Sequence, residues 1–352
     1  MPAVPPPPSS PPTLGADEPA PGAGNPPASP PGPPGGSGPA GTARRRGRPA
    51  SPGSPGRRGL LRAGLGLGGL AVVGTGATLA LSGSGSGTAP DGAGGSGSPS
   101  TTATPAGPAV VPSLRTEEQR SAARNGATVK MITIVPQGPG VPPAAELPVC
   151  VALHGRGATS RAWTELGLPQ ILVAAIAAGV PPFAVVALDG GDATYWRRTP
   201  SGDDPQRMLL DELPGRLAAR GLRAPSAAMG ISMGGFGSLR YARNRGEGFG
   251  PVAALSPALF RTWGDAEAVG VFRDEADWRE HEPLLHQDQP HGRPIGVWCG
   301  TEDPFCDAAR TLVGDTVQAR FTSGAHDAAY WRRILPDVVS FLGNALTSRT
   351  TT

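Results

Sequence analysis

The sequence is nearly devoid of lysine: Lys130 is the only one among 31 basic residues. With 53 glycines and 43 prolines in 352 residues, this bias is typical of a GC-rich bacterial genome. Residues 1–113 hold seven arginines and three acidic residues, which leaves 24 basic and 25 acidic residues in the rest of the chain. That nearly neutral remainder gives no support for binding to nucleic acid.

Cysteine is also scarce, with three residues, so the fold is not built on disulfides. Cys150 lies in an apolar run and is expected to be a buried thiol. Cys299 and Cys306 bracket a six-residue segment. They could form a disulfide that clamps this loop, or stay as two separate small core residues. No cluster of Cys, His and Asp has the spacing of a metal site, so we expect neither a metal nor a cofactor.

The first part of the chain lacks the apolar residues that a folded domain needs. We expect a disordered Pro/Gly/Ser-rich leader over 1–56 and a disordered linker over 82–113. Between them, 57–81 begins with paired arginines and resembles a twin-arginine export signal. Its uncharged run, 63–81, could instead remain as a membrane anchor, although six glycines weaken that interpretation. We therefore expect an exported protein, extracellular or in the cell envelope.

Residues 114–348 are expected to form one α/β domain, followed by a short tail over 349–352. Continuous apolar runs rich in β-formers alternate there with helical patterns, which favours a mostly parallel sheet with helices on both faces, a three-layer sandwich. A kink or a restart is expected at Pro336, inside the last helical pattern. The runs expected to form strands are Thr128–Val135, Leu147–Leu153, Phe183–Leu188, Ala224–Met229, Val252–Leu255, Pro294–Trp298 and Val317–Phe321.

One short motif, Gly230-Ile231-Ser232-Met233-Gly234, points to chemistry. In a nucleophile elbow, a strand ends at a sharp turn that carries the serine and leads into a helix. The motif alone is weak in such a glycine-rich chain, but an apolar strand pattern precedes Ser232 and a helical pattern follows it. Ser232 is therefore predicted to be a nucleophile.

A serine nucleophile needs a base and a carboxylate that orients the base. Of the histidines at 154, 281, 286, 291 and 326, only His326 follows the best-placed acid. That acid is Asp303, on the loop after a late strand, where Pro304 favours an extended residue before it. Glu302 is the runner-up, and the pair could instead merely cap a helix. Asp327 is expected to be a helix N-cap.

Acyl transfer also needs N–H donors aimed at the oxyanion. We expect the backbone N–H of Met233 as one donor and that of Arg156 as the other, with Gly155 as the alternative. His154 is expected to shape this turn rather than act as a base or ligand.

These residues resemble the esterase D-like branch of the α/β-hydrolases, which includes feruloyl esterases, S-formylglutathione hydrolases and secreted mycolyltransferases. The resemblance rests on segments 153–155, 211–214, 230–235, 300–305, 324–326 and 330–331. It implies ester hydrolysis or acyl transfer through an acyl-serine, without a cofactor. Arg156 and Cys306 depart from the family pattern, so the resemblance does not identify the residues of the acyl pocket.

Loops at the carboxyl ends of parallel strands line the cleft in such folds. Tyr195, Trp196 and Trp263 are therefore candidate substrate-binding residues, together with Ser256-Pro257. Tyr195 and Trp196 could equally close the core beneath a loop.

The expected protein is an exported serine esterase acting on a small-molecule or cell-envelope ester. It is expected to meet the membrane only through its signal or anchor segment. Two alternatives remain: an acyltransferase of the mycolyltransferase type, and a non-catalytic secreted binding protein on the same fold.

Overall fold

The computed structural model describes residues 109–287, 293–312 and 317–348. The leader, the export signal and most of the linker predicted above lie outside the described residues. Within these ranges, no helix is both long and apolar enough to cross a membrane.

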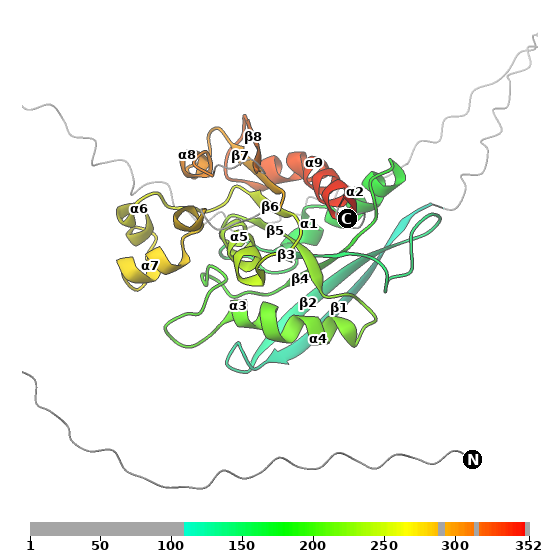
Figure 1. Cartoon of the computed structure of the whole chain (residues 1–352), viewed down its shortest axis with the longest axis horizontal. Coiled ribbons are helices and arrows are strands. Elements are labelled where there is room, and N and C mark those ends of the chain that lie inside the picture. Colours follow the sequence, from blue (N-terminus) through cyan, green and yellow to red (C-terminus); the bar gives the residue numbers. More distant parts are fainter. Residues whose placement is uncertain (1–108, 288–292, 313–316, 349–352) are drawn as a thin grey trace, which may run out of the picture. The chain divides into compact units, whose positions relative to one another are not determined.

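A single eight-stranded sheet forms the centre of the domain, in the order β1-β2-β4-β3-β5-β6-β7-β8 (Figure 1). The first two strands pair antiparallel, β2 also pairs antiparallel with β4, and every other pairing is parallel. Strands β3, β4, β6 and β7 are buried along their whole length because helices cover both faces. The strands are β1 Val111–Ser121, β2 Ala127–Gln137, β3 Val149–Leu153, β4 Ala184–Leu188, β5 Pro225–Ile231, β6 Val252–Leu255, β7 Ile295–Gly300 and β8 Val317–Thr322.

Helices connect the parallel strands. Four of them begin at an aspartate or threonine whose side chain accepts a backbone N–H of the first turn, as helix N-caps do: α3, α6, α7 and α9. The helices are α1 Ala162–Glu165, α2 Leu168–Ala177, α3 Pro205–Arg207, η1 Met208–Glu212, α4 Leu213–Ala218, α5 Met233–Arg245, α6 Trp263–Glu267, α7 Glu275–His281, η2 Pro283–His286, α8 Cys306–Ala309 and α9 Ala328–Thr347.

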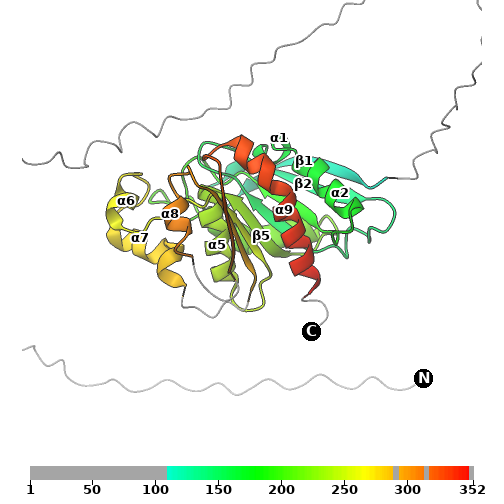
Figure 2. The same cartoon turned by 90° about the horizontal axis from the view of Figure 1, so that it is seen from above.

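Two hydrophobic cores, one on each face of the sheet, make the predicted three layers. Alternate residues of β3 divide between them: Val149, Val151 and Leu153 join one core, and Cys150 and Ala152 the other. The first core includes residues of α4, α5 and α8, and the second includes those of α1, α2 and α9. The helices α6 and α7 lie together at the end of the domain far from β1 and β2 (Figures 1 and 2). The predicted α/β class and mostly parallel sheet are confirmed.

The structure differs from the sequence-based expectation at two places. The linker was expected to run to residue 113, but β1 already begins at Val111. A kink or a restart was expected at Pro336; the helix does not restart there, because α9 continues through this proline for 20 residues in all. Its apolar side chains at Leu335, Val338 and Leu342 are fully buried against the sheet, and this packing stabilises a helix that propensity alone would interrupt.

Candidate active site

Three predicted residues meet at the carboxyl edge of the sheet. Ser232 follows β5, Asp303 follows β7 and His326 follows β8, and parallel strands present their carboxyl ends on the same edge. His326 Nε2 lies 2.9 Å from Ser232 Oγ, and its Nδ1 lies 2.8 Å from Asp303 Oδ2. With the Nδ1–H donating to the carboxylate, Nε2 is the acceptor for the serine hydroxyl. The geometry is that of a nucleophile, a base and a carboxylate that orients the base.

Ser232 occupies the sharp turn that its motif predicted. Its backbone has φ 56° and ψ −117°. Non-glycine residues are strained in this region, and residues with such strained backbones are found most often at functional sites. A Cβ on Gly230 would lie 2.0 Å from the Gly234 oxygen, and a Cβ on Gly234 would lie 2.0 Å from the Leu153 oxygen. Both glycines are therefore required by close approach of the backbone, and the turn holds the serine in place.

The backbone on both sides of the turn fixes the serine further. The Ser232 N–H donates to the Leu255 oxygen at 2.9 Å, and the Ala258 N–H donates to the Ser232 oxygen at 3.1 Å. These bonds tie the nucleophile to the end of β6 and the loop after it. Ser232 as a whole keeps 8% of its surface exposed.

The carboxylate of Asp303 is buried but well compensated. Its side chain is 0% exposed, and the Phe305 N–H donates to its Oδ1 at 2.9 Å. Burial acts to raise the pKa of Asp303, but hydrogen bonding and charge attraction from His326, together with that N–H, lower it below its usual range. Asp303 is therefore ionised at neutral pH, as a residue that stabilises an imidazolium must be.

The backbone N–H groups of Met233 and Arg156 are the predicted donors to the oxyanion. Met233 is the first residue of α5, so its N–H has no partner within the helix. Gly155 lies against the nucleophile, since a Cβ placed on it would be 3.4 Å from Ser232 Cβ. Among the described residues neither the Met233 nor the Arg156 amide has a hydrogen-bond acceptor. The Arg156 side chain is exposed, and its guanidinium lies 3.5 Å from the Val269 oxygen.

His154 shapes this loop, as the sequence predicted. Its Nδ1 lies 2.8 Å from the Gly155 oxygen, and its Nε2 accepts the Gly190 N–H at 2.8 Å. These partners require a proton on Nδ1 and none on Nε2. Burial lowers the pKa of His154, which keeps the ring neutral. The histidine thus joins the loop after β3 to the loop after β4.

Two aromatic rings flank the His326 imidazole. The ring of Phe305 lies 5.3 Å from that of His326 at an interplanar angle of 61°, and the ring of Trp331 lies 5.2 Å away at 86°. Both are edge contacts of the kind that favours a fixed ring orientation. Both residues lie in segments on which the family resemblance rests, but the sequence analysis assigned neither of them a role at the site.

The predicted substrate residues Tyr195 and Trp196 lie in the core. Their side chains are 3% and 0% exposed, and the Trp196 Nε1–H donates to the His154 oxygen at 3.1 Å. Their assignment to substrate binding is wrong, and the alternative, closure of the core beneath a loop, holds. Both residues have positive φ, 49° and 52°, which turns their side chains inward.

The other pocket candidates described here are Trp263 on α6 and Ser256 directly after β6. Trp263 is half-buried on α6, where its ring lies 6.4 Å from that of Trp278 on α7. Ser256 is fully buried, and its hydroxyl accepts the Trp331 Nε1–H at 3.1 Å. Ser256 therefore does not line a pocket.

The three cysteines are all buried free thiols. The disulfide considered for Cys299 and Cys306 is therefore absent, and they are two separate core residues. Burial raises the pKa of Cys299, so this thiol is protonated and unreactive. No group of three or more His, Cys, Asp or Glu side chains in the described ranges is arranged to hold a metal ion.

Residues 256–287, after β6, contain α6, α7 and η2 and are named the cap below. Arg197, from the loop after β4, binds it by a buried ion pair with Asp277 at 3.2 Å and by stacking on Phe272 at 4.9 Å. Phe272 contacts the rings of Tyr195, Phe236 and Phe260. An aromatic cluster thus holds the cap against the helix that follows the nucleophile.

Glu282 is a buried carboxyl within this cap. It accepts the Phe260 N–H, the Leu284 N–H and the Trp278 indole N–H, each at 3.2 Å. Burial nevertheless outweighs these donors and raises the pKa of Glu282 to about 8. The side chain is therefore protonated in the folded protein at neutral pH.

This carboxyl predicts a pH-dependent stability. The folded-state pKa of Glu282 is raised from an ordinary value of 4.5 to about 8, so between these values the folded protein holds a proton that the unfolded chain has lost. The free energy of unfolding should therefore fall as pH rises through that window, by about 1.4 kcal/mol for each pH unit. Urea unfolding at a series of pH values measures this free energy.

Glu282→Gln should flatten the dependence of the free energy of unfolding on pH, whereas Glu267→Gln, at an exposed site on α6, should not. Equal slopes for Glu282→Gln and the wild type would contradict this role.

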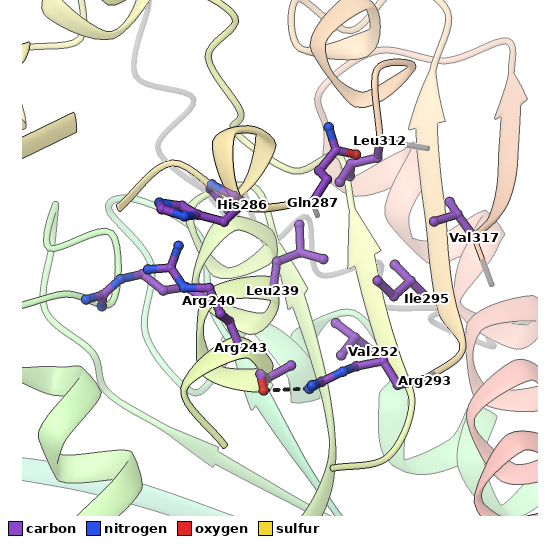
Figure 3. Close-up of a pocket in the computed structure, with 12 residues that line it drawn as sticks. Leu239, Arg240, Arg243, Val252, His286, Gln287, Arg293, Ile295, Leu312 and Val317 are labelled. Atoms are coloured by element: carbon purple, nitrogen blue, oxygen red, sulfur yellow. Dashed lines mark hydrogen bonds between the residues drawn. The ribbon is translucent and has the colours of Figure 1, made fainter. Parts of the chain in front are cut away.

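A cavity lies at the amino-terminal ends of β6, β7 and β8 (Figure 3). Ser232 lies at the other end of the strands, after β5. It is lined by the first residues of three strands, Val252, Ile295 and Val317, and by Leu239 of α5. The guanidinium of Arg293 beside it donates to the Ala242 oxygen. Because the strands begin here, this cavity has no part in the site at their carboxyl ends.

Solved structures of other proteins share the fold of this chain. The similar solved structures include a ferulic acid esterase (18% identity, TM-score 0.56, covering 67% of this chain and 99% of that chain). They also include an S-formylglutathione hydrolase from Agrobacterium tumefaciens (17%, TM-score 0.54, 67% and 96%) and MPT51 of Mycobacterium tuberculosis (19%, TM-score 0.52, 66% and 98%). At these identities the likeness shows the fold alone, which is the α/β-hydrolase fold.

No curated protein matches the sequence. A family model described as "Putative esterase" matches residues 124–342, which include the elbow, the acid loop and the histidine loop. That match covers most of the described domain, and the chain belongs to this esterase family.

Proposed function

We propose that this protein is a serine esterase that hydrolyses a carboxylic ester through an acyl-serine intermediate. The observation that carries the proposal is the unbroken hydrogen-bonded series from Asp303 through His326 to Ser232, with the serine on a strained turn. Membership of the esterase family supports the same class of reaction.

In the acylation step, the Ser232 hydroxyl attacks the carbonyl carbon of the ester while His326 Nε2 takes its proton. The bond that forms is Oγ–C, and the carbonyl π electrons move onto oxygen. When the tetrahedral intermediate collapses, the C–O bond to the alcohol breaks and His326 returns the proton to the leaving oxygen. Ionised Asp303 stabilises the imidazolium during both transfers.

Deacylation repeats these steps with water. His326 removes a proton from water, the resulting nucleophile attacks the acyl carbon, and the Ser232 oxygen leaves with the proton from His326. The products are a carboxylic acid and the regenerated serine. An added alcohol can replace water in this step, which is the acyltransferase alternative; hydrolysis is preferred because water is the default acceptor.

The developing oxyanion needs stabilisation in both steps. The amides of Met233 and Arg156 suit this role because one begins α5 and the other follows Gly155, which lies against the serine. The N-terminus of a helix adds a favourable field for negative charge. Each donor of this kind contributes about 3–4 kcal/mol to the transition state.

We also propose that the enzyme is exported and acts on a small-molecule or cell-envelope ester. The support is the paired arginines and the uncharged run within 57–81. Fractionation of the native host should then place the protein outside the cytoplasm, and recovery in the cytoplasm alone would contradict export.

A fluorophosphonate probe and short-chain p-nitrophenyl esters test the esterase proposal. The wild-type protein should hydrolyse the esters and lose this activity when labelled, and mass spectrometry should locate the phosphonyl group on the peptide that contains Ser232. Added alcohol tests the alternative: release of free acid alone favours a hydrolase, and diversion of the acyl group favours a transferase. Label on another residue, or none, would contradict the proposal.

A further inference from the structure

Ser256 places a buried hydroxyl next to the acid of the candidate triad. It directly follows β6 and is 0% exposed. Its φ is 45°, and its N–H donates to the Trp298 oxygen at 2.6 Å. A positive φ is costly for a serine. Asp303 follows the neighbouring strand β7. A hydrogen bond from the Ser256 side chain helps to lower the pKa of that carboxyl, after the larger contributions of His326 and the Phe305 N–H.

Trp331 contacts both this hydroxyl and the catalytic imidazole. It lies in the first turn of α9, which begins shortly after β8 and just beyond His326. The indole Nε1–H donates to Ser256 Oγ at 3.1 Å, and the indole ring makes its edge contact with His326. A hydroxyl that accepts an indole N–H directs its own proton elsewhere, and the carboxylate of Asp303 is the anionic acceptor within its reach.

We propose that Ser256 and Trp331 are positioning residues for the acid–base pair. The Trp331 indole orients the Ser256 hydroxyl so that it donates to Asp303, and the indole ring limits rotation of His326. This inference rests on the proposed function, since it concerns the same triad. The series of interacting side chains that positions the nucleophile thus extends from Ser232 to Trp331, which lies 99 positions later in the sequence.

The other titratable groups that face Asp303 do not change charge within the pH range of an esterase assay. The Cys299 thiol lies beside Ser256 and Asp303, and burial raises its pKa. Burial also raises the pKa of Tyr330 to about 12. Glu302, on the same loop, has a pKa below its usual range, chiefly because it accepts the Gly324 N–H. A change in the acid limb of the pH–rate profile therefore reports the Asp303–His326 pair.

The arrangement predicts the direction of that change. In Ser256→Ala, Asp303 loses a donor that stabilises its ionised form, so the carboxylate becomes more basic and holds the His326 imidazolium more strongly. The acid limb of kcat/KM should therefore move to higher pH. The orientation of the Asp303 carboxylate is also less constrained in this variant. We therefore expect kcat to fall about 10-fold to 100-fold with KM little changed, as for loss of one charge-assisted hydrogen bond.

The experiment measures pH profiles of wild type, Ser256→Ala, Trp331→Phe and the double variant, each normalised by fluorophosphonate titration of active sites. Trp331→Phe keeps a ring against His326 but loses the N–H, so its acid limb should shift in the same direction. Because the indole N–H acts through Ser256, the double variant should be no worse than Ser256→Ala alone. Two controls should keep the wild-type profile: Ser121→Ala, a buried hydrogen-bonded serine on β1, and Trp163→Phe, a buried tryptophan on α1.

The outcomes separate the two proposals. An inactive wild type that takes up no label refutes the esterase proposal itself. An active wild type whose Ser256→Ala and Trp331→Phe variants keep its pH profile refutes only the positioning role. Multiplied effects in the double variant would also refute it, because they would show that the two residues act independently. If Ser256→Ala does not fold, the shift in Trp331→Phe decides the question.

Discussion

Ser232→Ala should abolish esterase activity, with a fall in kcat of about 10⁶-fold. The substitution removes the only atom that can form the acyl bond and leaves His326 Nε2 without its 2.9 Å partner. Removal of one member of a triad costs nearly as much as removal of all three, because they act as a unit. Steady-state hydrolysis of a short-chain p-nitrophenyl ester measures the loss, and the fluorophosphonate label should disappear with it.

The folded state should survive this substitution. The steric strain at φ 56° and ψ −117° is the same for alanine as for serine, since both carry a Cβ. The hydrogen bonds to Leu255 and Ala258 use only the backbone of residue 232. Circular dichroism and the unfolding midpoint should therefore match those of the wild type. Ser121→Ala provides the matched control for loss of a serine hydroxyl. An active, labelled Ser232→Ala variant would contradict the assignment of the nucleophile.

Most of the sheet is predictable from the sequence because buried parallel strands appear as continuous apolar runs. The exception is β1, whose residues from Arg115 to Arg120 are all polar or charged. An edge strand with one neighbour needs no apolar run, because its ladder with β2 supplies backbone hydrogen bonds while its side chains face water. Its residues thus look like a continuation of the linker.

The triad residues are predictable because their chemistry and their order along the chain restrict the choice. Only one histidine follows the acid loop, and Pro304 favours Asp303 over its neighbour. The inward turn at Tyr195 and Trp196 is not predictable, because positive φ is rare at aromatic residues and no glycine marks it. The contact between Ser256 and Trp331 joins residues 75 positions apart, and only the folded sheet brings them together.

The structure also explains why the two adjacent acids are not equivalent. Asp303 is buried and binds His326. Glu302 is exposed, and its carboxylate accepts the Gly324 N–H and the Thr301 hydroxyl. Glu302 therefore steadies the loop that carries the histidine without touching the imidazole.

This difference predicts opposite results for two matched amide substitutions. Asp303→Asn should lower kcat by about 10⁴-fold, the loss expected when the base is held in the wrong tautomer. The Phe305 N–H, 2.9 Å from Oδ1, selects the carbonyl oxygen of the new amide, which leaves the amide nitrogen facing His326 Nδ1. Nδ1 must then accept a hydrogen bond, so Nε2 carries the proton and cannot take one from Ser232.

Glu302→Gln keeps an acceptor for the Gly324 N–H at an exposed site, so kcat should change less than about threefold. Both variants should fold, because each retains the size and most hydrogen bonds of the original side chain. The measurement is kcat for the same p-nitrophenyl ester over a range of pH, with active sites titrated. A large loss in Glu302→Gln with little loss in Asp303→Asn would transfer the role of the acid to Glu302. Comparable losses in both variants would mean that the loop as a whole, rather than the Asp303 carboxylate, orients the base.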